Sequence, residues 1–127
     1  HMMAIPQHRL VARAHRVADE ISAAMSAAGY AVSVGETAAT VGGGSLPGQS
    51  IPSWAVLISP ARESASLEAL EEILRLSEPP VIGRLENGKL VLDMRTVPEE
   101  KDPVLVGLLV EASERLGKPE ARTTFYG

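Results

Sequence analysis

The dipeptide Asn87-Gly88 places the firmest constraint on how this chain can fold. It lies within Glu86–Lys89, between the apolar runs Val81–Leu85 and Leu90–Thr96. Asn and Gly tolerate the positive φ angles of a two-residue turn, so this pattern predicts a β-hairpin of two antiparallel strands. A sheet built on that hairpin is mixed or antiparallel.

Hydrophobic spacing outside the hairpin predicts three helices and two further strands. The first helix follows Pro6, covers residues 10–28 and ends at Gly29; the second, capped by Ser64 or Ser66, extends through Leu76; the third covers residues 104–116. The strands are Tyr30–Val34, with a less certain continuation to Thr40, and Trp54–Ile58, whose continuous apolar run is typical of a strand buried on both faces.

The predicted order is helix, strand, strand, helix, strand, strand, helix, which indicates an α+β fold: a small four-stranded, mostly antiparallel sheet with helices packed on it. A chain of 127 residues suits one core. We expect a single domain over residues 3–118, with His1-Met2 as a cloning scar and residues 119–127 as a C-terminal tail.

Composition limits the classes of function. Hydrophobic residues make up 45% of the chain but aromatic residues only 3%, so the core is aliphatic and a base-stacking platform for nucleic acid is disfavoured. The net charge of −4 also argues against an autonomous nucleic-acid binder. One basic cluster exists, Arg9, Arg13 and Arg16, but Asp19 and Glu20 follow it, and we interpret the cluster as a solvated helix face.

The chain contains no cysteine, which excludes disulfides, thiolate metal sites and a cysteine nucleophile. His8 and His15 are two helical turns apart, too far to share a metal ion, so we expect both on the helix surface and no metal site. Without a signal peptide or a membrane-spanning run, we expect a cytoplasmic protein with no membrane partner.

The stretch Gly42-Gly43-Gly44-Ser45 is the most permissive segment of the backbone, and Pro47 and Pro52 stiffen the chain after it. It lacks the lysine of a phosphate-binding loop, and neither Ser45 nor Ser53 lies in a nucleophile elbow. We predict that Gly42, Gly43, Gly44 and Ser45 form a loop at an interface or a cleft.

Arg84 and Arg95 lie inside the two apolar strands of the predicted hairpin. An arginine in such a strand either faces solvent or presents its planar fork to a carboxylate or phosphate. Asp93 falls on the same side of its strand as Arg95, so a structural Asp93–Arg95 pair is the alternative to a ligand-binding role.

Four blocks in order, Val41–Gly48, Ile51–Ala55, Pro79–Arg84 with Glu86–Leu90, and Leu92–Val97, closely resemble the C-terminal part of the bacterial selenocysteine synthase family, L-seryl-tRNA(Sec) selenium transferase. The resemblance covers roughly residues 8 to 116. It implies a pyridoxal-phosphate enzyme of the aspartate-aminotransferase fold type that converts seryl-tRNA(Sec) to selenocysteyl-tRNA(Sec) with selenophosphate.

In that family a lysine of a large central domain holds the cofactor. Lys89, Lys101 and Lys118 are the only lysines here, and none has the setting of a Schiff-base lysine. The resemblance therefore implies the small C-terminal domain alone, inactive and without bound cofactor by itself. Its implied partners are the large domain, further copies in a homo-oligomer and, through other domains, tRNA(Sec). Arg95, with Arg84, would bind substrate in the cleft that this domain closes.

Two alternatives stay open at this point. The chain could be the small domain of a paralogous pyridoxal-phosphate enzyme that acts on a free amino acid or a sugar-amine, in which case Arg95 would grip a free carboxylate. It could instead be a stand-alone, non-catalytic interaction module.

Overall fold

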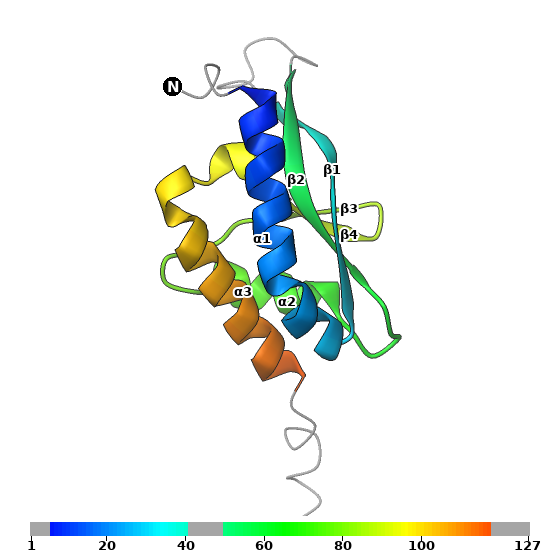
Figure 1. Ribbon diagram of the computed structural model, residues 1–127. Helices are drawn as coiled ribbons and strands as arrows, with labels where there is room; N and C mark the ends of the chain where they lie inside the picture. Colours follow the sequence, from blue (N-terminus) through cyan, green and yellow to red (C-terminus); the bar gives the residue numbers. More distant parts are fainter. Residues whose placement is uncertain (1–5, 41–49, 118–127) are drawn as a thin grey trace, which may run out of the picture.

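A computed structural model describes residues 6–40 and 50–117 of the chain. Three helices lie on one side of a four-stranded antiparallel sheet (Figure 1), which confirms the predicted α+β class and element order. The sheet order is β1-β2-β4-β3. The elements are α1 Gln7–Ala27, β1 Tyr30–Thr40, β2 Ser50–Pro60, α2 Leu67–Arg75, β3 Arg84–Glu86, β4 Lys89–Asp93, the 3-10 turns η2 Met94–Thr96 and η3 Glu99–Lys101, and α3 Asp102–Leu116.

Strands β1 and β2 form a long hairpin that pairs from Tyr30 opposite Pro60 to Thr40 opposite Ser50. This confirms the continuation of the first strand to Thr40. It also shows that the predicted Trp54–Ile58 is only the centre of an 11-residue strand. The continuous apolar run marked that centre, where Val56 and Ile58 pack against the helices, whereas serines and prolines interrupt the run towards both strand ends.

The second hairpin is confirmed around its turn, where Asn87 and Gly88 both have positive φ. The prediction of a strand over all of Val81–Leu85 is wrong, because β3 begins only at Arg84. The backbone N–H of Val81 donates to the carbonyl of Leu74, 2.8 Å away, so this part of the chain is held by the end of α2.

The prediction that the fourth strand continues to Thr96 is also wrong, since β4 ends at Asp93 and η2 follows. The Asp93 side chain accepts the backbone N–H of Arg95 at 2.9 Å, and the Thr96 hydroxyl donates to the Asp93 carbonyl at 2.7 Å. Such local side-chain bonds compete with the hydrogen bonds of a sheet. They turn the chain out of β4.

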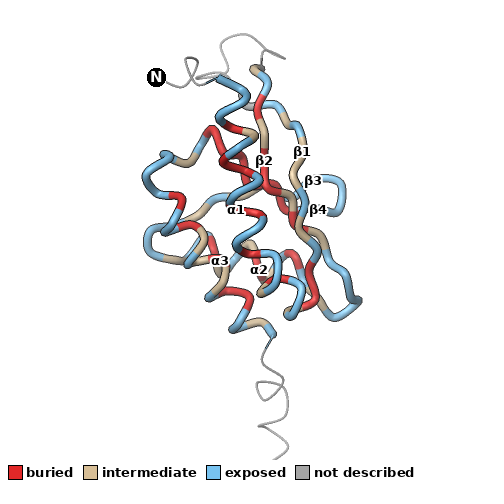
Figure 2. The backbone as a smooth tube through the Cα atoms, viewed as in Figure 1, coloured by how far each residue is buried: buried red, intermediate tan, exposed pale blue. Residues whose placement is uncertain are grey.

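The aliphatic core lies between the three helices and one face of the sheet, and Figure 2 shows buried positions concentrated where the two layers meet. Val56 and Ile58 of β2 pack there with residues of all three helices. Ser66 caps α2 by accepting the N–H of Ala69. Leu76, which the periodicity assigned to this helix, instead follows its last residue and is 69% exposed.

Tyr30 joins this core to the start of α2. Its ring is buried and its hydroxyl donates to the Ser66 carbonyl at 2.7 Å. Burial raises the pKa of Tyr30 above the ordinary tyrosine value. Because the folded pKa exceeds the unfolded one, the stability that the neutral phenol contributes is complete below about pH 10 and is lost as the pH rises through the folded pKa.

We therefore expect Tyr30→Phe to lower the free energy of unfolding at pH 7 by about 1 kcal/mol through the lost hydrogen bond. Above pH 10 the variant should lose less stability than the parent chain, since it has no buried phenol to ionise. Urea unfolding followed by circular dichroism at both pH values measures this. An identical alkaline loss in the two proteins would show that Tyr30 does not carry the effect.

Candidate functional site

The candidate site lies on the face of the sheet opposite the helices. Side chains alternate along a strand, so the neighbours of the core residues Val56 and Leu92 point to this other face. Register pairs Thr37 with Ser53 and Ala55 with Asp93, and Arg84 lies opposite Val91. Polar side chains from all four strands therefore share one surface.

Asp93 is the centre of this surface and is 3% exposed. Its Oδ1 accepts two hydrogen bonds, from the Ser53 hydroxyl at 2.5 Å and from the backbone N–H of Arg95 at 2.9 Å. Its Oδ2 lies 3.9 Å from Nη1 of Arg84. One carboxylate thus joins β2, β4, η2 and the start of β3. Ser53, which does not lie in a nucleophile elbow, is buried and donates its hydroxyl to this carboxylate.

Arg84 reaches across the surface from the edge strand β3. Its Nη2 donates to the Thr37 hydroxyl of β1 at 2.8 Å, and its Nε donates to Glu86 at 2.8 Å. The side chain keeps 39% of its area exposed. Arg84 is therefore both a tie between the two edge strands and a guanidinium that solvent or a ligand can reach.

The sequence predicted that Arg95 lies in a strand, but it lies in the turn η2 and is 6% exposed. Its Nη2 donates to the carbonyl of Pro52 at 2.7 Å. The contact predicted between Asp93 and Arg95 is made by the backbone N–H of Arg95, and the ion pair of Asp93 is with Arg84. The structure thus brings both predicted arginines to one carboxylate. Gly42, Gly43, Gly44 and Ser45 lie outside the described residues.

Arg13 is the residue that sequence reasoning misjudged most. It is not part of a solvated helix face but 2% exposed, and it makes a two-pronged ion pair with Asp102 at 2.7 and 2.9 Å. Its guanidinium also donates to the carbonyls of Met94 and Val97. Arg13 therefore holds the turn that carries Arg95 against α1. The sequence signal for this burial is its position next to Ala14 and three residues after Leu10, on the buried face of the helix.

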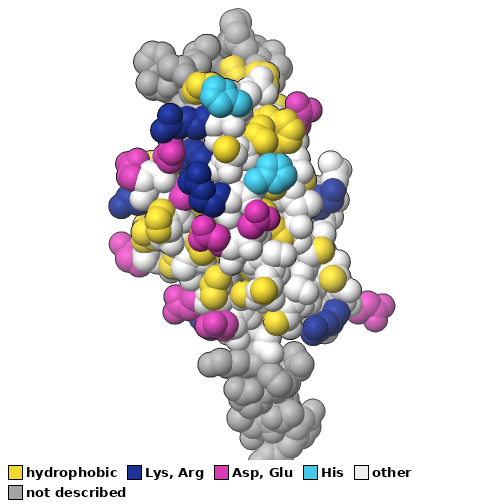
Figure 3. Space-filling model, in the orientation of Figure 1, with side chains coloured by type: hydrophobic (Ala, Val, Ile, Leu, Met, Phe, Trp, Pro, Cys, Tyr) yellow, Lys and Arg dark blue, Asp and Glu magenta, His cyan; other side chains and the backbone are white. Residues whose placement is uncertain are grey.

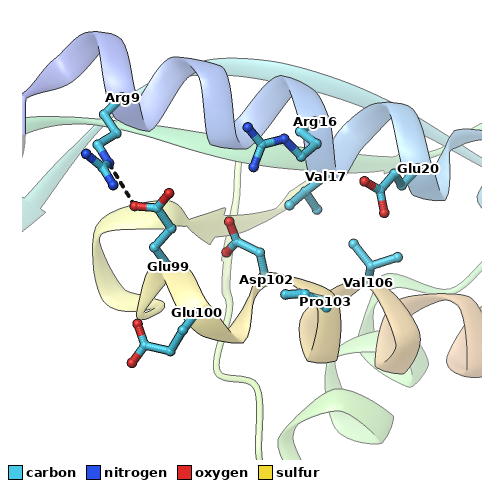
Figure 4. Close-up of a pocket in the computed structure, with 9 residues that line it drawn as sticks. All are labelled: Arg9, Arg16, Val17, Glu20, Glu99, Glu100, Asp102, Pro103 and Val106. Carbon is cyan, nitrogen blue, oxygen red and sulfur yellow. Dashed lines mark hydrogen bonds and ion pairs between the residues drawn. The ribbon is translucent and has the colours of Figure 1, made fainter.

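Arg9 and Arg16 do lie on the outside of α1, at a hollow of about 540 Å³ between this helix and the start of α3 (Figure 4). Arg9 donates to Glu99 at 2.7 Å, and this hydrogen bond lowers the pKa of Glu99. Glu20, Glu100 and Asp102 also line the hollow. Figure 3 shows basic and acidic side chains interleaved over this face. Such mixed walls do not favour a polyanion.

The remaining predictions from the sequence concern the histidines, metal binding and membrane-spanning helices. His8 and His15 are exposed, as expected. Within residues 6–40 and 50–117 there is no group of three or more side chains that could hold a metal ion. No helix in the same part of the chain has the length and apolarity needed to cross a bilayer.

Comparison with known proteins identifies one family. Residues 1–98 match the family described as "SelA: L-seryl-tRNA selenium transferase". The L-seryl-tRNA(Sec) selenium transferase of Rhizobium meliloti (strain 1021) is 38% identical over 101 residues, which cover 80% of this chain and 22% of the relative. The protein of the same name from Desulfovibrio desulfuricans is 36% identical over 118 residues, 85% of this chain and 24% of the relative. The chain thus spans about a fifth to a quarter of these relatives.

Proposed function

The chain belongs to the L-seryl-tRNA selenium transferase family, and we propose that it forms the small C-terminal domain of such an enzyme. In this role it closes one side of an active-site cleft whose cofactor and reacting groups lie on the remaining chain. The parent would replace the hydroxyl of serine on tRNA(Sec) with selenium from selenophosphate, in the cytoplasm and as a homo-oligomer. The observation that carries the proposal is the family match over residues 1–98 by a chain much shorter than its relatives.

The residues that the structure describes do not fit pyridoxal phosphate by themselves. A Schiff-base lysine needs a desolvated or electrostatically tuned setting that lowers its pKa. The two described lysines, Lys89 at the hairpin turn and Lys101 in η3, are both exposed. Cofactor chemistry therefore belongs to the parent's other domains in this proposal, and this domain contributes a wall.

Within that wall we assign different tasks to the two arginines. Arg84 keeps an accessible guanidinium and is the candidate for contact with an anionic or carbonyl group of the substrate. Arg95 is buried and holds the backbone of β2 at Pro52, so it keeps the surface in shape. The loop residues Gly42, Gly43, Gly44 and Ser45 are proposed to border the same cleft because they follow β1 closely in the sequence.

A chimera tests the proposal. The matched region of the Rhizobium meliloti enzyme is replaced by this chain, and selenocysteyl-tRNA formation from seryl-tRNA and selenophosphate is measured. We expect activity within about tenfold of the parent, because a correctly seated small domain preserves the geometry of the reacting groups. The same enzyme without its matched region is expected to be inactive.

Arg84→Ala in the active chimera tests the proposed substrate contact. Its matched control is Arg75→Ala, because Arg75 is also an exposed arginine and pairs with Glu71 on α2. Loss of a substrate contact should lower kcat/KM by about tenfold to a hundredfold, while the control stays unchanged. A folded, cofactor-loaded chimera without activity would contradict the role of this chain as the small domain.

A further inference from the structure

A second surface feature adjoins the candidate site. An apolar groove of about 570 Å³ runs between the segment Pro79–Ile82, the end of β4 and the first turns of α3. Its apolar lining comes mainly from prolines and aliphatic side chains of these three parts and of the segment between β4 and α3, including Ile82, Val97, Val104 and Leu108. Ile82 is 64% exposed and Val104 is 40% exposed. Large aliphatic side chains gathered at one open groove mark an interaction surface.

The polar lining of the groove points to a polypeptide occupant. Asp93 lines it, and its buried Oδ2 has the Arg84 guanidinium 3.9 Å away but accepts no hydrogen bond within the described residues. Buried carboxylate oxygens in proteins nearly always accept one, so a donor from the occupant would complete this group. Arg84 and Lys101 stand at the same groove. An apolar segment with an N–H or O–H donor, such as a backbone amide or a hydroxyl side chain, matches this combination.

We propose that this groove binds an apolar segment from the part of the parent enzyme outside the matched region. The inference rests on the proposed function and adds the contact surface to it. Roughly four-fifths of the Rhizobium meliloti relative lies outside the matched region, so ample chain exists to cover the groove. The groove also ends at Arg84 and Asp93, which places the seated segment next to the proposed substrate wall.

Thiol footprinting tests the occupant. The chain has no cysteine of its own, so Ile82→Cys introduces one thiol into it at the exposed groove. Alkylation of the peptide that carries this thiol is followed by mass spectrometry in the isolated chain and in the chimera. We expect the reaction in the chimera to be slower by about tenfold or more, because reactivity of a thiol depends on its exposure. Denaturant should abolish the difference.

The outcomes separate this inference from the proposed function. An active chimera in which Ile82→Cys reacts as fast as in the isolated chain overturns the groove assignment and leaves the proposed function standing. An inactive chimera in which the thiol is protected overturns the proposed function and leaves the groove assignment standing. Protection in the isolated chain that grows with its concentration identifies a second copy as the occupant, which also overturns the proposal.

Should the chimera fail to fold, the isolated chain still decides whether the groove binds apolar groups. The probe is 1-anilinonaphthalene-8-sulfonate, an apolar anion suited to the basic rim. Ile82→Asp should weaken its binding by about fivefold or more, whereas Leu76→Asp, at an equally exposed leucine outside the groove, should change it by less than about twofold. Equal effects of the two substitutions would overturn the proposal.

Discussion

Replacing Arg13 by methionine is expected to lower the free energy of unfolding by about 3–5 kcal/mol, the usual cost of removing one partner of a buried ion pair. The substitution leaves the Asp102 carboxylate buried without its cation. It also removes the hydrogen bonds to the carbonyls of Met94 and Val97. Because a domain of this size is stable by about 5–15 kcal/mol, this loss is a large share of the total stability.

The measurement is urea unfolding followed by the fluorescence of Trp54, the single tryptophan of the chain. The matched control is Arg16→Met, one turn along the same helix and exposed, which should change the stability by no more than about 0.5 kcal/mol. If both substitutions cost the same, Arg13 does not act through its buried contacts.

The double variant Arg13→Met with Asp102→Leu sharpens this test. Replacing both members of a buried ion pair by apolar groups is often neutral or stabilising, because two desolvation costs disappear together. We therefore expect the double variant to be more stable than Arg13→Met alone. A further loss instead would mean that Asp102 stabilises the fold independently of Arg13, as the acidic residue in the first turn of α3.

Local signals account for the parts of the fold that the sequence predicted correctly. The hairpin at Asn87-Gly88 depends on two residues that accept positive φ, and the helix cap at Ser66 depends on a side chain three residues from its partner. Core positions of α1 repeat at helical spacing because one face packs on the sheet. None of these inferences requires knowledge of residues far away in the sequence.

The errors occurred where distant partners decide the structure or where local side-chain bonds end a strand. Arg13 is buried because Asp102, 89 residues later, neutralises it, and periodicity alone assigned its charge to solvent. Arg95 seemed to extend an apolar strand, but the short-range bonds of Asp93 and Thr96 end that strand. The gathering of Arg84, Asp93 and Ser53 depends on the register of β3, β4 and β2, which the amino-acid pattern did not fix. The sequence thus predicted Arg84 and Arg95 as site residues but did not predict the groups that hold their side chains in place.

Asp93→Ala should cost about 2–4 kcal/mol of unfolding free energy, the second large effect that we expect, because it leaves buried donors without their acceptor. The Ser53 hydroxyl and the Arg95 N–H both lose their bond to Oδ1, and the guanidinium of Arg84 loses its nearest buried counter-charge. Asp93→Asn keeps an oxygen acceptor at the same position. It should therefore cost less, about 1–2 kcal/mol.

The control for Asp93→Ala is Glu86→Ala, which removes the other carboxylate paired with Arg84 but at an exposed position. Exposed ion pairs contribute about 0–1 kcal/mol, so this variant should unfold almost as the parent chain does. Urea unfolding of the three variants separates two views of the site. If burial and hydrogen bonding make Asp93 the centre of the surface, the loss is largest for Asp93→Ala, smaller for Asp93→Asn and smallest for Glu86→Ala. If Arg84 needs only a nearby negative charge, Glu86→Ala and Asp93→Asn should cost the same, and the hydrogen bonds of Asp93 would then have no special weight.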